Sequence, residues 1–138
     1  MSAKPFLDTN VILYLLSSDE AKANRAEALL AQGGTISVQV LNEAVNVMTK
    51  KLKMGLDEVC EVLAGVRYAC DVLPVTLEMH DLALDIMRRY SFSIYDSGIV
   101  AAAAIAGCTN LYSEDLQDGQ RVAPDLTIAN PFKHEDPH

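Results

Sequence analysis

Short apolar runs alternate along the chain with longer segments in which apolar residues recur at helical spacing. The first run, Pro5–Leu7, ends at Asp8, and apolar residues then recur from Val11 to Leu16 at the spacing of one helix face. This pattern predicts a short strand that passes directly into a helix, with Asp8 at the junction.

The same alternation continues to the end of the chain. Further strands are predicted at Thr35–Val38, Val72–Thr76, Thr109–Ser113 and Leu126–Ala129. Helices are predicted from a cap at Ser18 or Asp19 to Gly33, from Leu41 to Leu52, after Gly55, over about Leu77–Tyr90 and over Ile99–Ala106. Strands that alternate with helices are typical of βαβ units, so we predict an α/β fold with a central parallel sheet and helices on both faces.

The chain length predicts one domain. Its 138 residues fall within the roughly 100–200 that a domain usually takes. No repeat, linker or low-complexity tract divides it, so residues 1–138 are expected to form a single unit with a frayed tail over 130–138.

Charge and cysteine content narrow the classes of function. The chain has 11 Lys and Arg and 19 Asp and Glu, which gives a net charge of −8. Proteins that bind duplex nucleic acid or membrane surfaces through basic residues carry an excess of cations, so both classes are disfavoured. The three cysteines, Cys60, Cys70 and Cys108, form no CxxC pair and are interpreted as apolar fillers in a reducing compartment. The apolar run Val11–Leu16 is too short for a signal peptide or membrane span, so a cytoplasmic protein without membrane contact is expected.

Acidic residues mark the predicted site. In open parallel sheets, ligands bind beyond the carboxyl ends of the strands. Asp8 follows the first predicted strand, and Glu114, Asp115 and Asp118 follow the strand Thr109–Ser113. Two more acids lie against apolar surface: Glu43 at the edge of a helical stripe, and Asp96 at the start of the most apolar helix.

Carboxylates against buried surface are costly unless they are paired or bind metal. Mg²⁺ and Mn²⁺ prefer carboxylate oxygens and keep several waters, and three or four carboxylates can hold one or two such ions for attack on a phosphodiester. The metal would also reverse the local charge that otherwise repels phosphate. The sequence thus predicts a metal-dependent site for an anionic substrate.

Each acid also has an alternative structural role. Asp8 is equally typical of a turn or helix cap, and Asp96 of a helix N-cap. Glu43 could pair with Lys50 or Lys51, and the loop acids could simply be solvated. Spacing in the sequence does not separate these roles from metal binding.

Four segments, in order, resemble the motifs of the PIN-domain family. They are Phe6–Val11, Ser37–Glu43, Tyr95–Ser97 with Ile99–Ala103, and Leu111–Leu116, the last in a form common among VapC-type toxins. The resemblance implies an α/β/α sandwich and a ribonuclease dependent on Mg²⁺ or Mn²⁺. It implies metal binding by Asp8, Glu43, Asp96 and Asp115, with Asp118 and Glu114 in reserve for the fourth position, and supporting roles for Thr9, Asn10 and Ser113.

The resemblance also implies partners. RNA is the expected substrate, a small antitoxin the expected inhibitor, and a homodimer the expected assembly. Two other functions remain open from the sequence: a non-catalytic PIN-like or receiver-like binding module, and a metal-dependent phosphoesterase that acts on DNA or small phosphates, because a metal site does not by itself read a 2′-hydroxyl.

Overall fold

The computed structural model describes residues 4–133. Its strands are β1 (Phe6–Leu7), β2 (Gly34–Ser37), β3 (Cys70–Leu73), β4 (Asn110–Tyr112), β5 (Arg121–Ala123) and β6 (Leu126–Ala129). Its helices are α1 (Thr9–Leu13), the 3₁₀ turn η1 (Tyr14–Leu16), α2 (Glu20–Gln32), α3 (Val38–Lys50), α4 (Leu56–Ala69), α5 (Leu77–Tyr90) and α6 (Ile94–Ile105).

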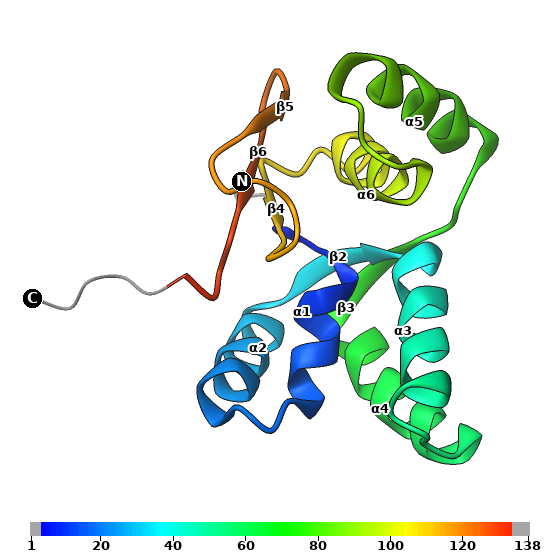
Figure 1. Ribbon diagram of the computed structural model, residues 1–138, viewed down its shortest axis with the longest axis vertical. Coiled ribbons are helices and arrows are strands. Elements are labelled where there is room, and N and C mark those ends of the chain that lie inside the picture. The colour runs from blue at the N-terminus through cyan, green and yellow to red at the C-terminus, as the bar shows by residue number, and fades with distance from the viewer. Residues whose placement is uncertain (1–3, 134–138) are drawn as a thin grey trace, which may run out of the picture.

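The strands form one sheet in the order β3-β2-β1-β4-β6-β5. Every neighbouring pair is parallel except β5 and β6, which form an antiparallel hairpin at one edge. Helices α5 and α6 cover one side of the sheet, and α1–α4 lie on the other (Figure 1). The predicted three-layer α/β/α architecture is confirmed, with one antiparallel strand added to the parallel sheet.

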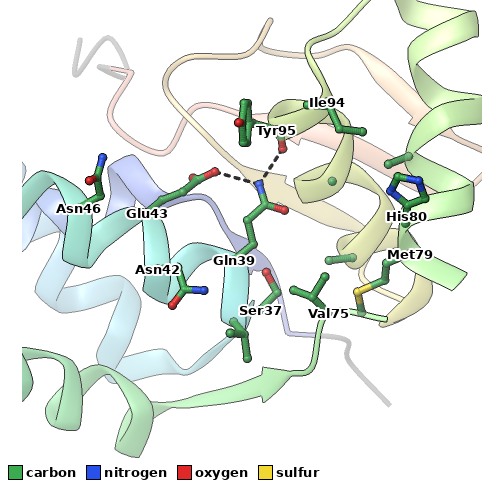
Figure 2. A pocket seen from close by; sticks show the side chains of 14 residues that line it. Ser37, Gln39, Asn42, Glu43, Asn46, Val75, Met79, His80, Ile94 and Tyr95 are labelled. Atoms are coloured by element: carbon green, nitrogen blue, oxygen red, sulfur yellow. Dashed lines mark hydrogen bonds between the residues drawn. The ribbon is translucent and has the colours of Figure 1, made fainter. Parts of the chain in front are cut away.

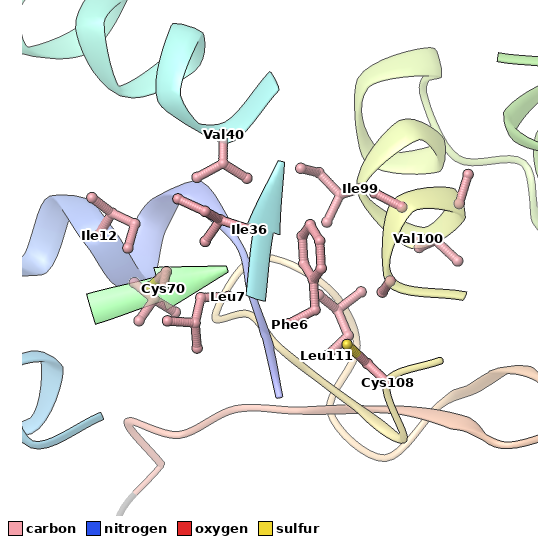
Figure 3. Close-up of a cluster of buried hydrophobic side chains, with 14 of the residues drawn as sticks. Phe6, Leu7, Ile12, Ile36, Val40, Cys70, Ile99, Val100, Cys108 and Leu111 are labelled. Carbon is pink, nitrogen blue, oxygen red and sulfur yellow. The ribbon is translucent and has the colours of Figure 1, made fainter. Parts of the chain in front are cut away.

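The core lies around β1, at the centre of the sheet. Phe6 and Leu7 are both fully buried, because successive strand residues face opposite layers and both layers are covered. Phe6 lies toward Ile99 of α6, and Leu7 lies toward Cys70 (Figure 3). Each such side chain contributes about 1.5–3 kcal/mol through burial, so the end of β1 is a rigid support for Asp8.

Most predicted elements are confirmed, with shifted boundaries. The strand predicted at Val72–Thr76 is β3, which starts at Cys70 and ends before Pro74, and it lies at a sheet edge as a proline-limited strand should. Val38 starts helix α3 rather than ending β2. Strand β5 was not predicted, because its three residues carry too short a pattern.

Two expectations about burial are wrong. Leu52, the last apolar residue of the helix predicted from Leu41, is not buried with the others: it follows the helix end and is 47% exposed, while Val40 is fully buried. Cys60 is exposed on α4, so it is no apolar filler, whereas Cys70 and Cys108 are buried and reduced. Within residues 4–133, no helix is both long and apolar enough to cross a membrane.

The start of the expected tail packs on the domain. The ring of Phe132 meets that of Tyr14 edge to face, with centroids 4.7 Å apart, and Arg25 Nε donates a hydrogen bond of 2.9 Å to the carbonyl of Pro131. The remainder of the tail, residues 134–138, lies outside the described residues.

Candidate active site

Asp8 lies at the carboxyl end of β1, beside the end of β4. Its amide donates to the carbonyl of Tyr112, and its side chain is 5% exposed. Oδ1 accepts a 2.7 Å hydrogen bond from the amide of Thr9, and Oδ2 accepts one of 2.8 Å from the hydroxyl of Ser113. Asp8 is therefore the N-cap of α1, as one alternative held, and at the same time a buried carboxylate at the predicted site.

Burial raises the pKa of Asp8 from 3.8 to about 6. The hydrogen bonds from Ser113 and Thr9 lower this pKa, but the charges of Glu43 and Asp96 raise it. The two donated hydrogen bonds therefore do not compensate the carboxylate fully. A buried carboxylate in this condition favours a cation beside it.

Glu43 is held from both sides. Thr9 Oγ1 donates to Glu43 Oε1 at 2.6 Å, and Gln39 Nε2 donates to Oε2 at 2.9 Å. The same Gln39 amide donates to the carbonyl of Tyr95 at 2.9 Å, which ties α3 to α6 (Figure 2). The suggested pairing of Glu43 with Lys50 or Lys51 is therefore wrong.

Asp96 lies in the first turn of α6, not at its cap. Ser93 is the N-cap, and its hydroxyl accepts a 3.0 Å hydrogen bond from the amide of Asp96. The N-cap alternative for Asp96 is therefore wrong, and its carboxylate remains available. Burial raises the pKa of this carboxyl, the hydrogen bond to Ser93 lowers it, and the charges of Asp115 and Glu43 raise it further.

The three loop acids have different surroundings. Glu114 accepts hydrogen bonds from Tyr14 and, at 3.1 Å, from Lys22, and these bonds, that from Tyr14 foremost, lower its pKa. Asp118 accepts from the amide of Asn130 at 2.8 Å and from Lys133 at 3.2 Å, and the amide bond is the main cause of its lowered pKa.

Asp115 differs from both of its neighbours in the loop. Its Oδ2 accepts a 3.0 Å hydrogen bond from the Asn10 amide, and it forms no ion pair with any described residue. The charge of Asp115 raises the pKa of Asp96. These surroundings favour Asp115 over Glu114 and Asp118 as the fourth acid of the site.

Ser113 and Asn10 link the loop to Asp8. Ser113 Oγ, which donates to Asp8, accepts from the amides of Asp115 and Leu116 at 3.2 and 3.3 Å. Asn10 Oδ1 accepts from the amide of Glu114 at 3.2 Å. With Thr9 on Glu43, the three predicted supporting residues each contact an acid of the site or the backbone that carries one.

Gln39 is a site residue that the sequence analysis missed. It is fitted against Gly98 so closely that a Cβ on Gly98 would lie 2.5 Å from Gln39 Oε1. One signal was present: Gln39 precedes Glu43 by four residues, which places both on the same face of a helix. The contact with α6 had no signal in the sequence.

The four carboxylates suit a divalent cation by chemistry. Their donors are all oxygens, as Mg²⁺ and Mn²⁺ prefer, and none of Asp8, Glu43, Asp96 and Asp115 forms an ion pair within the described part of the chain. The charges of Glu43 and Asp96 raise the pKa of Asp8, and the charges of Asp115 and Glu43 raise the pKa of Asp96. Across residues 4–133, however, no three His, Cys, Asp or Glu side chains lie close enough to form a complete ion-binding group as they stand. The acids are neighbours and not a closed cage.

Comparison with known proteins agrees with this description. The PIN domain family profile matches residues 6–123, which include all four acids. No curated protein sequence matches the chain.

Solved structures share the fold at low identity. VapC20 of Mycobacterium tuberculosis, described as a toxin that cleaves the sarcin-ricin loop, is 23% identical with a TM-score of 0.64, over 80% of this chain and 88% of that one. A toxin–antitoxin complex from Klebsiella pneumoniae is 19% identical with a TM-score of 0.69, over 92% of this chain and 97% of that one. DNA-bound VapBC from Salmonella typhimurium is 22% identical with a TM-score of 0.67, over 94% of this chain and 98% of that one.

Proposed function

Because this chain belongs to the PIN-domain family, we propose that it is a cytoplasmic, metal-dependent endoribonuclease that acts as the toxin of a type II toxin–antitoxin pair. One observation carries the proposal: four carboxylates from distant parts of the chain gather at one end of the sheet, two of them with raised pKa values, and no cation of the described residues neutralises them.

Asp8, Glu43, Asp96 and Asp115 would hold the Mg²⁺ or Mn²⁺. When bound, the metal supplies Lewis-acid chemistry, which activates a water for attack on the phosphodiester. The chain's own residues set the positions of the acids. Ser113 and the Thr9 amide fix Asp8, the Thr9 hydroxyl and Gln39 fix Glu43, and Asn10 fixes Asp115.

The neighbours in structure support the toxin assignment. One is described as a toxin that cleaves the sarcin-ricin loop, one as a toxin–antitoxin complex and one as DNA-bound VapBC, and this chain shares their fold over most of its length. We extend the partner to this chain: an antitoxin that presents a cation to the four acids. Arg suits this role best because its guanidinium binds a carboxylate through two hydrogen bonds.

We also propose a homodimer, supported by an apolar face of the molecule. A shallow hollow of about 800 Å³ is lined by one charged residue, Arg67, and otherwise by Val38, Leu41, Ala64, Tyr68, Val72 and Pro74, and Tyr68 is 95% exposed. Exposed apolar surface of this kind marks contact sites. Light scattering coupled to size exclusion should give twice the chain mass for wild type and a smaller mass for Tyr68→Glu. A wild-type monomer at all concentrations would exclude the dimer.

The test of the nuclease uses purified protein and structured RNA. We expect cleavage in Mg²⁺ or Mn²⁺, with 5′-phosphate and 3′-hydroxyl ends, and none in EDTA. Asp96→Asn should be inactive, and Asp85→Asn is the matched control, since Asp85 is an exposed acid paired with Arg88 on α5. Cleavage in EDTA, or by Asp96→Asn at the wild-type rate, would refute the metal mechanism. Cleavage of DNA but not RNA would support the phosphoesterase, and binding without cleavage of either would support the binding module.

A further inference from the structure

A hollow of about 530 Å³ lies between α3 and the α5–α6 pair. Its walls include Ser37, Asn42, Val75, Met79, His80 and Tyr95 (Figure 2). Its volume falls within the roughly 300–1,000 Å³ of pockets that bind small molecules or parts of larger ones.

The hollow is continuous with the acidic site. Gln39 and Glu43 line it, and the side-chain amide of Gln39 donates to Glu43 the hydrogen bond that fixes its carboxylate. In Figure 2, Glu43 and Tyr95 lie at one end, and Val75, Met79 and His80 lie at the other. A group in the hollow would therefore sit beside any substrate at the acids.

A buried hydroxyl in the wall has no partner. Ser37 is 1% exposed, its Oγ makes no hydrogen bond, and although it is the N-cap residue of α3 it does not cap the helix with its side chain. An unsatisfied buried hydroxyl costs about 1–3 kcal/mol. A ligand with a hydrogen-bonding edge would remove that cost.

The chemistry of the walls selects the type of ligand. No Lys or Arg lines the hollow and Glu43 is its one acid, so a phosphate is disfavoured there. Val75, Met79 and Ala83 offer apolar contact, and Asn42 and Ser37 offer hydrogen bonds. Tyr95, also in the wall, is 68% exposed and offers a ring for stacking. An aliphatic side chain would leave the Ser37 hydroxyl unsatisfied. A flat, uncharged ring with polar edges can contact the apolar residues, stack on Tyr95 and form a hydrogen bond with Ser37.

We propose that this hollow is a subsite for one unpaired nucleobase of the RNA, adjacent to the phosphodiester at the four acids. The inference rests on the proposed ribonuclease function and deepens it. Proteins that recognise single-stranded RNA stack its bases on aromatic rings and bind their edges with polar side chains. Here Tyr95 would supply the stacking surface and Ser37 a hydrogen bond to the edge.

The test uses two variants and two matched controls. Ser37→Ala removes the hydroxyl in the hollow, and Ser97→Ala removes the other buried hydroxyl without a partner, which does not line it. Tyr95→Ala removes the ring at the rim, and Leu56→Ala removes an exposed apolar side chain that does not line the hollow. The Ser37→Ala fold should hold, since the lost hydroxyl has no partner.

Affinity is measured by fluorescence anisotropy, in EDTA, on short labelled single-stranded A, C and U homopolymers. We expect Tyr95→Ala to lose about tenfold in affinity and Ser37→Ala to lose the wild-type preference among the three, with both controls unchanged. In Mg²⁺ the same two variants should raise KM and leave kcat near wild type. Wild-type affinity and base preference in both variants would overturn the subsite, even if RNA is still cleaved.

The two proposals fail separately. If wild type cleaves no RNA but Ser37→Ala and Tyr95→Ala weaken its binding, the nuclease function is wrong and the base subsite stands. If both variants bind and cleave RNA as wild type does, yet form a weaker complex with a co-expressed protein partner, the hollow receives a protein side chain and the subsite is wrong.

Discussion

Ser113 donates its hydroxyl to Asp8 at 2.8 Å, across 105 residues of sequence. The contact follows from the sheet. Strands β1 and β4 are parallel neighbours with Leu7 opposite Tyr112, so the residues that follow them, Asp8 and Ser113, lie side by side at the carboxyl end of the sheet. The position of the Asp8 carboxylate is thus set by strand register, and the hydroxyl of the residue after β4 fixes it.

Removal of that hydroxyl should destabilise the protein. In Ser113→Ala, Asp8 loses one of its two hydrogen bonds and the amides of Asp115 and Leu116 lose their acceptor. We expect about 2 kcal/mol of lost unfolding free energy at pH 7, because hydrogen bonds to charged groups contribute about 1.5–3 kcal/mol. Urea denaturation measures it, with Ser97→Ala as a control that loses no hydrogen bond. Equal stability of the two variants would show that Ser113 does not support Asp8.

Asp8→Asn should stabilise the metal-free protein. With its pKa raised from 3.8 to about 6, Asp8 binds more protons in the folded than in the unfolded state between these values. The free energy of unfolding therefore falls as pH rises from about 4 through about 6, and the penalty is complete above that range. The shift corresponds to about 3 kcal/mol. Asparagine replaces one accepting oxygen with a donor, so we expect a net gain of about 1 kcal/mol at pH 7.

Thermal melts in EDTA and in Mg²⁺ or Mn²⁺ check this prediction. In EDTA, the advantage of Asp8→Asn should be present at pH 7 and absent near pH 4. The variant should also lose most of the stabilisation that metal gives wild type. A variant that is less stable in EDTA and responds to metal as wild type does would leave Asp8 only its role as the cap of α1.

The loop acids provide a test of the fourth ligand. Asp115→Asn should lower cleavage by more than the roughly 10–100-fold that loss of an outer-shell partner costs. Glu114→Gln and Asp118→Asn should keep activity within a few-fold, because these acids already pair with Lys22 and Lys133. Cleavage rates at saturating Mg²⁺ decide it. If Asp118→Asn is the inactive one, the assignment moves to Asp118.

The parts of the site that the sequence could predict follow from local pattern. A strand that ends at Leu7 places Asp8 at the carboxyl end of the sheet, and helical spacing places Glu43 beside a buried stripe. The loop after β4 is predicted in the same way. Periodicity is a property of neighbouring residues, and these acids are neighbours of well-patterned elements.

The parts that it could not predict depend on packing between distant elements. Gln39 reaches Tyr95 across 56 residues, and Gly98 matters only because α6 crosses α3 at that point. Local spacing does not separate Glu114, Asp115 and Asp118: the family resemblance alone favours Asp115, and the physical reason, the places of Lys22 and Lys133 in space, comes only from the structure. No spacing in the chain encodes these contacts.

Gly98→Ala should separate stability from activity. Alanine is favoured over glycine in a helix by about 1 kcal/mol, but its Cβ at this position would lie 2.5 Å from Gln39 Oε1. That atom is the end of a flexible side chain, so the clash is relieved when the Gln39 amide moves, and the fold keeps most of the gain. The movement breaks the hydrogen bonds to Glu43 and to the Tyr95 carbonyl.

We therefore expect Gly98→Ala to match or exceed wild-type stability and to lose about tenfold in cleavage rate, the lower part of the range for an outer-shell partner. Gly65→Ala is the matched control: it lies within α4, nothing is within 4 Å of its added Cβ, and it should gain stability without any change in cleavage. Thermal melts and cleavage rates of both variants test the argument. Full activity in a stable Gly98→Ala would show that Glu43 does not depend on Gln39, because the three atoms nearest to the added Cβ all belong to the Gln39 side chain.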